Sequence, residues 1–535
     1  MNRHELHDLG GGTSSGLLAA RASQAPDNLA LVFCGREYSY GELDRQATAV
    51  AGGLMALGIK QGEAVSIFVS NRPEYLMTSY GLSRAGMITV PINLAYKGEF
   101  LQYVIEHSDA TVLVIESAFA AVLGTLAQWP SALQTIIYIG DEAPQIANPD
   151  VRIISWDELL ASGDANPEFP TVLPQDTGAI SFTSGTTGKS KGVVSPNLQG
   201  VVMARETAIA FGLTPRDRLY TCMPLFHGMA QVTTCLAAIY AGAAIILSPR
   251  FSVSNLWEEV RASKATQFNA LGSMLHMLLS TPPSPLDREH DVQCVFAAPA
   301  PPEVLYRFES RFGVHVLEGY GQTEIKNVIY NPRYGRKIGS LGKPTASSII
   351  EIHDDNGDAL PSGMIGEIVY RPRMPNIMLK YYHRNADATL SSMRGLWWHT
   401  GDLGSMDDDG FVYFHDRKSD SLRRRGENIS SQEVEAALVA FSSVVDAAAV
   451  GVHSDVGEDE VLVVFESSQP ENFDFEALFQ HCVHALPRFM VPRYYRLMAS
   501  MPRTPTGKVR KVALREDGLT ADIWDHVQAG LVVPR

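Results

Sequence analysis

Short apolar runs alternate with amphipathic stretches through the first half of this 535-residue chain. Residues 39–58 space their apolar side chains as a helix does, and residues 64–69 (AVSIFV) form a continuous apolar run. The same pairing recurs at 97–108 with 110–116 and again within 218–248. Strands that are apolar on both faces belong in parallel sheets covered by helices. The pattern therefore predicts an α/β fold with at least two layers of this kind.

The pattern changes in the second half of the chain. Residues 340–415 carry short strands and turns typical of antiparallel β structure, with DDNGD at a turn. A new α+β pattern starts near residue 420, and 535 residues exceed one ordinary core. We predict a large N-terminal domain and a small C-terminal one, with the charged segment 415–428 as a linker.

Charge and cysteine usage exclude several classes of protein. The formal net charge of −15 argues against a nucleic-acid binder, although a local basic anion site remains possible. The five cysteines are scattered and predict neither a zinc site nor disulfides. The N-terminus has no apolar signal region, and no stretch reaches the length of a membrane span, so we expect a cytoplasmic protein.

The segment 181–197 (SFTSGTTGKSKGVVSPN) concentrates glycines, hydroxyls and lysines. It fails as a Walker P-loop, because Thr183 stands where that motif needs its first glycine. Its chemistry still suits a polyphosphate, and a solvated polar hairpin is the alternative. The candidate phosphate ligands are Thr183, Ser184, Gly185, Thr186, Thr187, Gly188, Lys189 and Lys191.

Three further segments have to be explained together with this loop: EGYGQTE (318–324), WWHTGDLG with FHDRKSDSLRRRGE, and PRTPTGKVRK near the C-terminus. In this order, over residues 28–515, the four segments resemble the adenylate-forming superfamily of acyl-CoA synthetases, adenylation domains and luciferases. The residues in and around YYHRNADAT and WWHTGDLG are similar to those of the carnitine/crotonobetaine-CoA ligase branch. The resemblance implies stacked α/β sheets with a β-barrel-like subdomain over 1–416, a hinge at 417–421 and a small mobile α+β domain over 422–535.

The resemblance also implies a reaction that uses ATP, Mg²⁺ and CoA. A carboxylic acid reacts with ATP to give an acyl-adenylate and pyrophosphate, and the thiol of CoA then displaces AMP. The loop would hold the β and γ phosphates, Thr323 the α-phosphate, and Glu324 the metal ion. Lys508 would reach both the carboxylate and the α-phosphate, and His227 would stand at the entrance of the acyl pocket. A surface lysine and a buried structural histidine are the alternatives.

The nucleotide and CoA sites follow from the same resemblance. Tyr320 would stack on adenine, while Asp402, otherwise a turn aspartate, and Arg417 would hold the ribose. Gly426 would border the pantetheine tunnel, and Arg423, with Arg424 and Arg425, would meet CoA phosphates, unless these arginines are solvated linker charges. The other expected cofactor-binding residues are Ala298, Glu318, Gly319, Gly321, Gln322 and Phe414.

Three positions depart from the family pattern. Ser190 replaces a common proline, which should make the loop more mobile, and Ser419 replaces the usual hinge aspartate or lysine. Phe296 stands at a glycine position in the wall of the acyl pocket and could shorten it. The resemblance builds that wall from 224–235, 269–275, 296–300 and the strand before Tyr320, which are largely apolar.

The leading hypothesis is an acid:CoA ligase, and two alternatives remain. One is an adenylation enzyme that loads a carrier-protein phosphopantetheine, and the other is a non-catalytic nucleotide-binding sensor. The arginines at 423–425 favour CoA, and the retained Glu324, Asp402, Arg417 and Lys508 argue against a sensor. The expected partners are small molecules, a homodimer is possible, and the sequence leaves the acid unidentified.

Overall fold

The computed structural model describes residues 9–146, 148–164, 167–183, 190–297, 302–417, 422–424, 427–429, 431–453, 459–502, 509 and 511–534. The chain divides into two compact units. The large unit comprises residues 1–182, 192–270 and 277–416, and the small unit comprises 183–191, 271–276 and 417–535. No helix in the described ranges is both long enough and apolar enough to cross a membrane.

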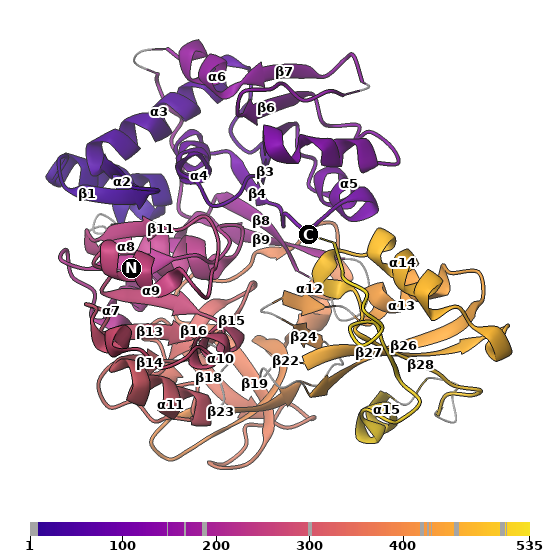
Figure 1. The fold of residues 1–535 in the computed structure, drawn as a ribbon. Coiled ribbons are helices and arrows are strands. Elements are labelled where there is room, and N and C mark those ends of the chain that lie inside the picture. Colours follow the sequence, from indigo (N-terminus) through magenta and orange to yellow (C-terminus); the bar gives the residue numbers. More distant parts are fainter. Residues whose placement is uncertain are drawn as a thin grey trace. The chain divides into compact units, whose positions relative to one another are not determined.

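Two mainly parallel sheets form the framework of the large unit (Figure 1). The order of the first sheet is β20 (Tyr381–Tyr382), β9 (Lys191–Pro196), β8 (Thr177–Thr183), β4 (Ile88–Pro91), β3 (Ala64–Phe68), β5 (Val112–Glu116), β6 (Thr135–Ile139) and β7 (Arg152–Ser155). The order of the second sheet is β14 (His315–Leu317), β13 (Cys294–Ala297), β12 (Gln267–Ala270), β10 (Arg218–Thr221), β11 (Ala244–Leu247), β1 (Leu29–Phe33) and β2 (Arg36–Ser39).

The strands at the centre of these sheets are buried because helices cover them. Every residue of β3 and of β5 is buried, and the two strands pair in parallel with Val65 opposite Val112. The helices of the large unit are η1 (Gly10–Gly12), α2 (Ser14–Gln24), α3 (Tyr40–Ala56), α4 (Pro73–Ala85), α5 (Gly98–His107), η2 (Ser117–Thr125), α6 (Trp156–Ser162), α7 (Asn197–Phe211), the π-helix η3 (Met229–Leu236), α8 (Ala237–Ala241), α9 (Leu256–Ala262), η4 (Pro285–Arg288), α11 (Pro302–Phe312) and α12 (Ala386–Ser392). Helix α10 (Gly272–Leu279) contributes residues to both units.

Antiparallel structure follows β14, as the sequence predicts. A small sheet joins β15 (Gly319–Gln322), β16 (Lys326–Tyr330) and β17 (Lys343–Pro344). A larger sheet joins β18 (Ser348–His353), β19 (Gly366–Pro372), β22 (Trp397–Met406) and β21 (Met393–Arg394), with β23 (Val412–Arg417) paired to β22. Both sheets share one core, in which Tyr320, Ile329, Ile368 and Trp398 are buried. Packing thus joins the 319–330 hairpin to a strand about 70 residues later.

The small unit is built on the sheet β26 (Val444–His453), β27 (Asp459–Ser467), β28 (Tyr494–Leu497) and β29 (Trp524–Asp525). Its helices are α13 (Ser431–Val439), η5 (Pro470–Asn472), α14 (Phe475–Ala485), η6 (Arg488–Met490) and α15 (Lys511–Asp517). The alternating mixture of helices and strands confirms the predicted α/β class with a small α+β unit at the C-terminus.

The prediction of a linker over 415–428 was wrong for part of that segment. Strands β24 (Leu422–Arg424) and β25 (Glu427–Ile429) form an antiparallel hairpin, in which Leu422 and Ile429 are buried. Leu422 and Ile429 stand at paired positions of this hairpin, so part of a segment whose high charge suggests a solvated linker is folded.

Candidate active site

The hairpin β15–β16 carries several of the predicted nucleotide residues. It starts two residues after β14 and pairs Gly319 with Tyr330 and Gln322 with Lys326. A Cβ atom on Gly321 would overlap the carbonyl group of Lys326, so only glycine permits this close pairing. The requirement explains why a glycine stands between Tyr320 and Gln322.

The structure brings Tyr320, Gln322 and Asp402 together in a hydrogen-bonded group, which we call the adenosine cluster. The hydroxyl of Tyr320 donates to Oδ2 of Asp402 at 2.7 Å, and Nε2 of Gln322 donates to the same oxygen at 2.9 Å. The Gln322 amide also donates to the carbonyl of Thr400 at 2.8 Å and accepts from the Trp398 indole at 3.3 Å. Asp402 is only 3% exposed, so its carboxylate is held in place by donors on β15.

Glu318 lies directly before the hairpin and is buried. Burial raises the pKa of its carboxyl group to about 7, against the opposing effect of the backbone N–H of Gly339, which donates to it. Phe414, in β23, is instead 45% exposed. These two residues therefore lie in opposite environments, although the sequence resemblance places both at the nucleotide.

Glu324 lies in the turn of the hairpin, next to the half-buried Thr323. The hydroxyl of Tyr382 donates to its Oε1 at 2.7 Å, and its backbone carbonyl accepts from Nε2 of Gln199 and from the N–H of Leu379. Among described residues, Oε2 of Glu324 accepts no hydrogen bond. A buried carboxylate with one oxygen fixed and the other open suits a hard cation that takes its remaining ligands from phosphates and water. No cluster of three or more His, Cys, Asp or Glu side chains occurs in the described ranges, so Glu324 alone carries this prediction.

Thr183 ends β8 and Lys191 begins β9, so the described chain frames the predicted phosphate loop. The hydroxyl of Ser190 donates to the carbonyl of Thr183 at 2.8 Å. This bond ties the two ends of the loop, and the proline common at position 190 could not make it. The predicted gain in loop mobility stays a prediction.

His227 precedes the π-helix η3, and its ring lies 4.5 Å from that of Phe226. The preceding segment is anchored by Asn71, which sequence reasoning missed. Its amide donates to the carbonyls of Met223 and Ser248 at 2.9 and 3.0 Å and accepts from the N–H of Leu225 at 2.9 Å. Asn71 follows β3 by three residues, and the polar end of an apolar strand was the signal that could have identified it.

The predicted acyl side lies at the carboxyl ends of β12 and β13. Phe296 is 3% exposed, and its ring lies 5.3 Å from that of Phe211 and 5.9 Å from that of Tyr330. A Cβ atom on Gly319 would come within 3.0 Å of the Phe296 ring. The phenyl group that replaces glycine is therefore packed into an aromatic group formed by Phe211, Phe296 and Tyr330.

The polar groups on this side are largely paired with one another. Thr207 donates its single hydroxyl hydrogen to the carbonyl of Met203, so Tyr330 must donate to Thr207 across their 2.6 Å contact. Nδ2 of Asn327 lies 3.4 Å from the hydroxyl oxygen of Thr233. Burial raises the pKa of Tyr330 to about 12, so its hydroxyl stays protonated at neutral pH.

Arg424 does not have the role that its sequence suggests. Its Nε donates to Glu460 at 3.0 Å, and its Nη1 donates to the carbonyl of Val491 at 2.6 Å. Only 6% of the residue is exposed. The prediction that it meets CoA phosphates was wrong, because its donors already hold the small unit together.

Several predicted site residues lie outside the described ranges. They are Ser184, Gly185, Thr186, Thr187, Gly188, Lys189, Ala298, Ser419, Arg425, Gly426 and Lys508. Arg417 ends β23 and Arg423 lies in β24, but their side chains are likewise outside the description. Their predicted roles stay predictions.

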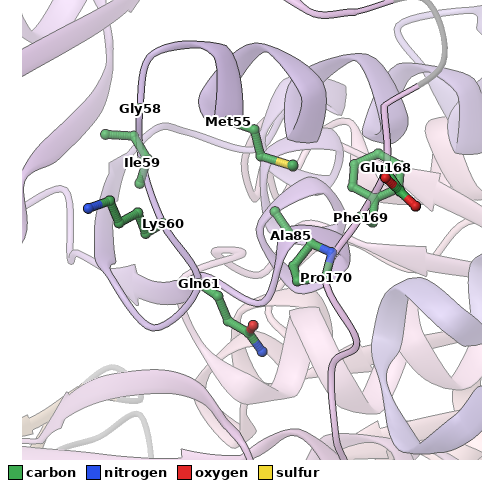
Figure 2. A pocket seen from close by; sticks show the side chains of 9 residues that line it. All are labelled: Met55, Gly58, Ile59, Lys60, Gln61, Ala85, Glu168, Phe169 and Pro170. Carbon is green, nitrogen blue, oxygen red and sulfur yellow. The ribbon is translucent and has the colours of Figure 1, made fainter.

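A separate pocket of about 600 Å³ opens in the large unit (Figure 2). One part of it is lined by Met55 of α3, Ala85 of α4 and the turn 58–61, and the other part is lined by residues 168–170. None of the predicted site residues belongs to this lining. The pocket is therefore distinct from the predicted site.

Comparison with known proteins adds an independent line of support. The model of the AMP-binding enzyme family matches residues 18–382, and that of the AMP-binding enzyme C-terminal domain matches 433–508. Crotonobetaine/carnitine–CoA ligase of Salmonella heidelberg is 31% identical over 486 residues, which cover 90% of this chain and 93% of the relative.

Solved structures agree. The o-succinylbenzoate CoA synthetase of Bacillus subtilis superposes with a TM-score of 0.81 at 25% identity, covering 94% of this chain and 98% of its own. A fatty acyl CoA synthetase of Mycobacterium tuberculosis gives a TM-score of 0.68 at 25% identity, covering 95% and 98% of the two chains. This chain therefore belongs to the AMP-binding enzyme family and is an adenylate-forming enzyme of the acyl-CoA synthetase type.

Proposed function

We propose that this chain is an ATP-dependent carboxylic acid:CoA ligase that acts on a compact acid, because the ring of Phe296 takes up space on the predicted acyl side. A carboxylate oxygen attacks the α-phosphorus of ATP, and the bond from that phosphorus to pyrophosphate breaks. The sulfur of CoA then attacks the acyl carbonyl carbon, and AMP leaves with the oxygen that it gained. The adenosine cluster is the observation that carries this proposal, because it joins two of the four sequence motifs through hydrogen bonds to one buried carboxylate.

The adenosine cluster would bind the nucleoside. The aligned carboxylate of Asp402 would accept hydrogen bonds from the ribose hydroxyls, and the Tyr320 ring would stack on adenine. Arg417 would hold the ribose with its guanidinium group. The rest of the nucleotide site in this proposal consists of Glu318, Gly319, Gly321, Ala298 and Phe414. Family membership and the cluster's geometry support these assignments.

The phosphates need cations and donors. Residues 183–189 and Lys191 would hold the β and γ phosphates, and Thr323 would donate to the α-phosphate. Glu324 would bind Mg²⁺ through its open oxygen, and the bound ion would neutralise charge on the phosphates. Lys508 would hold the substrate carboxylate beside the α-phosphorus, with His227 at the acyl entrance.

The second half-reaction requires a change of backbone conformation at the junction near residue 417. We propose domains at 1–416 and 422–535 with a hinge at 417–421, and the division into units, which changes at residue 417, supports this. Gly426 and Arg423 would then face CoA. A homodimer and a cytoplasmic location stay predictions.

The test is pyrophosphate release from ATP and Mg²⁺ across short, medium, branched, cyclic and aromatic acids and betaines, with and without CoA. We expect acid-dependent release and a CoA thioester of at least one compact acid. Release that ends in a bound acyl-adenylate, with transfer only to a carrier protein, would replace CoA by that acceptor. ATP binding with no release for any acid would overturn the proposal in favour of a sensor.

A further inference from the structure

Asn269 is a buried amide on the predicted acyl side with one half of its hydrogen-bonding capacity unused. It is 2% exposed and lies next to last in β12. Its Nδ2 donates to the carbonyl of Met229 at 3.3 Å. Its Oδ1 has no hydrogen-bond partner among the described residues. Buried amide oxygens are almost always paired, so this one requires an explanation.

The orientation of the amide is set by its neighbour. Turning the amide over would bring Oδ1 against the Met229 carbonyl, and two acceptors would then face each other. The carbonyl of Met229 also lies 3.3 Å from the hydroxyl of Thr234, within the π-helix η3. π-helical turns occur frequently at functional sites. The oxygen of Asn269 is therefore the group left open.

The position of Asn269 is that of a ligand-binding residue. Asn269 and Phe296 are paired in register on neighbouring parallel strands, so their side chains lie on the same face of the sheet. Both stand at the carboxyl ends of their strands, where α/β sheets bind ligands. Because Phe211, Phe296 and Tyr330 pack against one another, that aromatic group leaves no slot between its rings for a cation.

We propose that the acid activated by this enzyme carries a neutral hydrogen-bond donor on its acyl group, a hydroxyl or an amide N–H, and that Oδ1 of Asn269 accepts it. The inference rests on the proposed ligase function and narrows its substrate class. A neutral donor suits this site because the two groups next to the amide on its face of the sheet, the carbonyl of Met229 and the ring of Phe296, carry no charge.

A site built to pair a substrate hydroxyl discriminates strongly against the analogue that lacks it, because the buried protein group is then left unpaired. A site that merely tolerates a hydroxyl does not. The ratio of kcat/KM between matched acids therefore separates a specificity residue from a structural asparagine whose oxygen binds a trapped water molecule.

The experiment measures kcat/KM for pyrophosphate release with matched acids of equal chain length. The pairs are butyrate with 3-hydroxybutyrate and with 4-hydroxybutyrate, and glutarate monomethyl ester with glutaramate. For the wild-type enzyme we expect at least one donor-bearing acid to exceed its partner by roughly tenfold or more. In Asn269→Leu that ratio should fall at least tenfold, while KM for ATP stays within about twofold. Asn269→Ser, which keeps a small acceptor, should recover part of the ratio.

Asn327→Leu is the matched control, since it removes an amide that is already paired with Thr233. It should lower both members of each pair by a similar factor. Wild-type ratios near one, or an Asn269→Leu variant that lowers both members equally, would overturn the inference and leave the ligase function intact. Absence of pyrophosphate release with every acid would instead overturn the ligase function. If Asn269→Leu fails to fold, the wild-type ratios and Asn269→Ser still test the inference.

Discussion

The adenosine cluster and the acyl side differ in how completely their polar groups are paired. In the adenosine cluster, the side chains of Tyr320 and Gln322 both donate to Asp402. The Gln322 amide is also hydrogen-bonded to Thr400 and Trp398. On the acyl side, the hydroxyls of Thr207 and Tyr330 are paired, but the side-chain oxygen of Asn269 has no partner in the part of the chain that the structure describes. The first region is organised before any ligand arrives, whereas the second retains an open acceptor.

This difference matches two different tasks. Every ATP-dependent acid ligase binds the same nucleotide, so one preformed arrangement serves all substrates. The acid differs between relatives, and the group that recognises it need not belong to a shared motif. Mutations in the adenosine cluster should therefore affect ATP, and mutations on the acyl side should affect the choice of acid.

The largest effect is expected at Lys508, which belongs to neither region. Lys508→Ala should reduce acyl-adenylate formation roughly a thousandfold, because a charge that stabilises the transition state is lost. Thioester formation from a supplied acyl-adenylate should stay within a few-fold of the wild type. Single-turnover measurements of the two half-reactions check this, and an equal fall in both, in a folded variant, would refute the assignment of Lys508 to the first step.

Asp402→Ala should raise KM for ATP roughly 10- to 100-fold, since the ribose loses its carboxylate acceptor and Tyr320 and Gln322 each lose a hydrogen bond. KM for the acid should change little. Tyr320→Phe is the matched control, because it removes one donor to Asp402 and keeps the ring, and it should give a smaller rise. Steady-state kinetics with each substrate varied in turn check both variants. An equal rise in KM for acid and ATP would erase the distinction between the two regions.

Phe296→Ala should act on the acyl side alone. It empties part of the aromatic group and should lower the free energy of unfolding by about 3–5 kcal/mol. Longer acids should gain kcat/KM relative to short ones, with KM for ATP unchanged. Urea denaturation and the acid panel check the two effects. Unchanged selectivity in a destabilised protein would show that Phe296 belongs to the core and not to the substrate wall.

The smallest effect is expected at His383, whose backbone N–H donates to the carbonyl of Gly192 in β9. Burial lowers the pKa of His383, and His107 and Arg384 lower it further, while Asp109 acts in the opposite direction. The unfolded chain therefore binds a proton more readily than the folded one. The resulting stability is present above the ordinary histidine pKa of 6.5 and is lost as the pH falls below it.

In His383→Asn the fall in melting temperature between pH 7.5 and pH 5.5 should be shallower than in the wild type. Thermal unfolding at several pH values checks this prediction. A steeper slope in His383→Asn would show that the sign is wrong.

Much of the fold was predictable because its signals are local. Continuous apolar runs such as 64–69 became buried parallel strands, and the turn signal in 354–358 lies in antiparallel structure, between β18 and β19. The linker prediction failed because it relied on charge alone. Burial of Leu422 and Ile429, and the pairing of Arg424 with Glu460, depend on residues that are remote in sequence.

The sequence by itself determined the α/β class, the family and the residues of the adenosine cluster, because shared chemistry on a common nucleotide keeps these residues in readable motifs. Only the tertiary structure decided which side chains are paired. It showed that Asp402 accepts from two donors about 80 residues away and that Arg424 is paired with Glu460. It also showed that, within the described ranges, the side-chain oxygen of Asn269 has no hydrogen-bond partner. Pairing depends on three-dimensional distance and burial, and a single sequence carries no direct record of either.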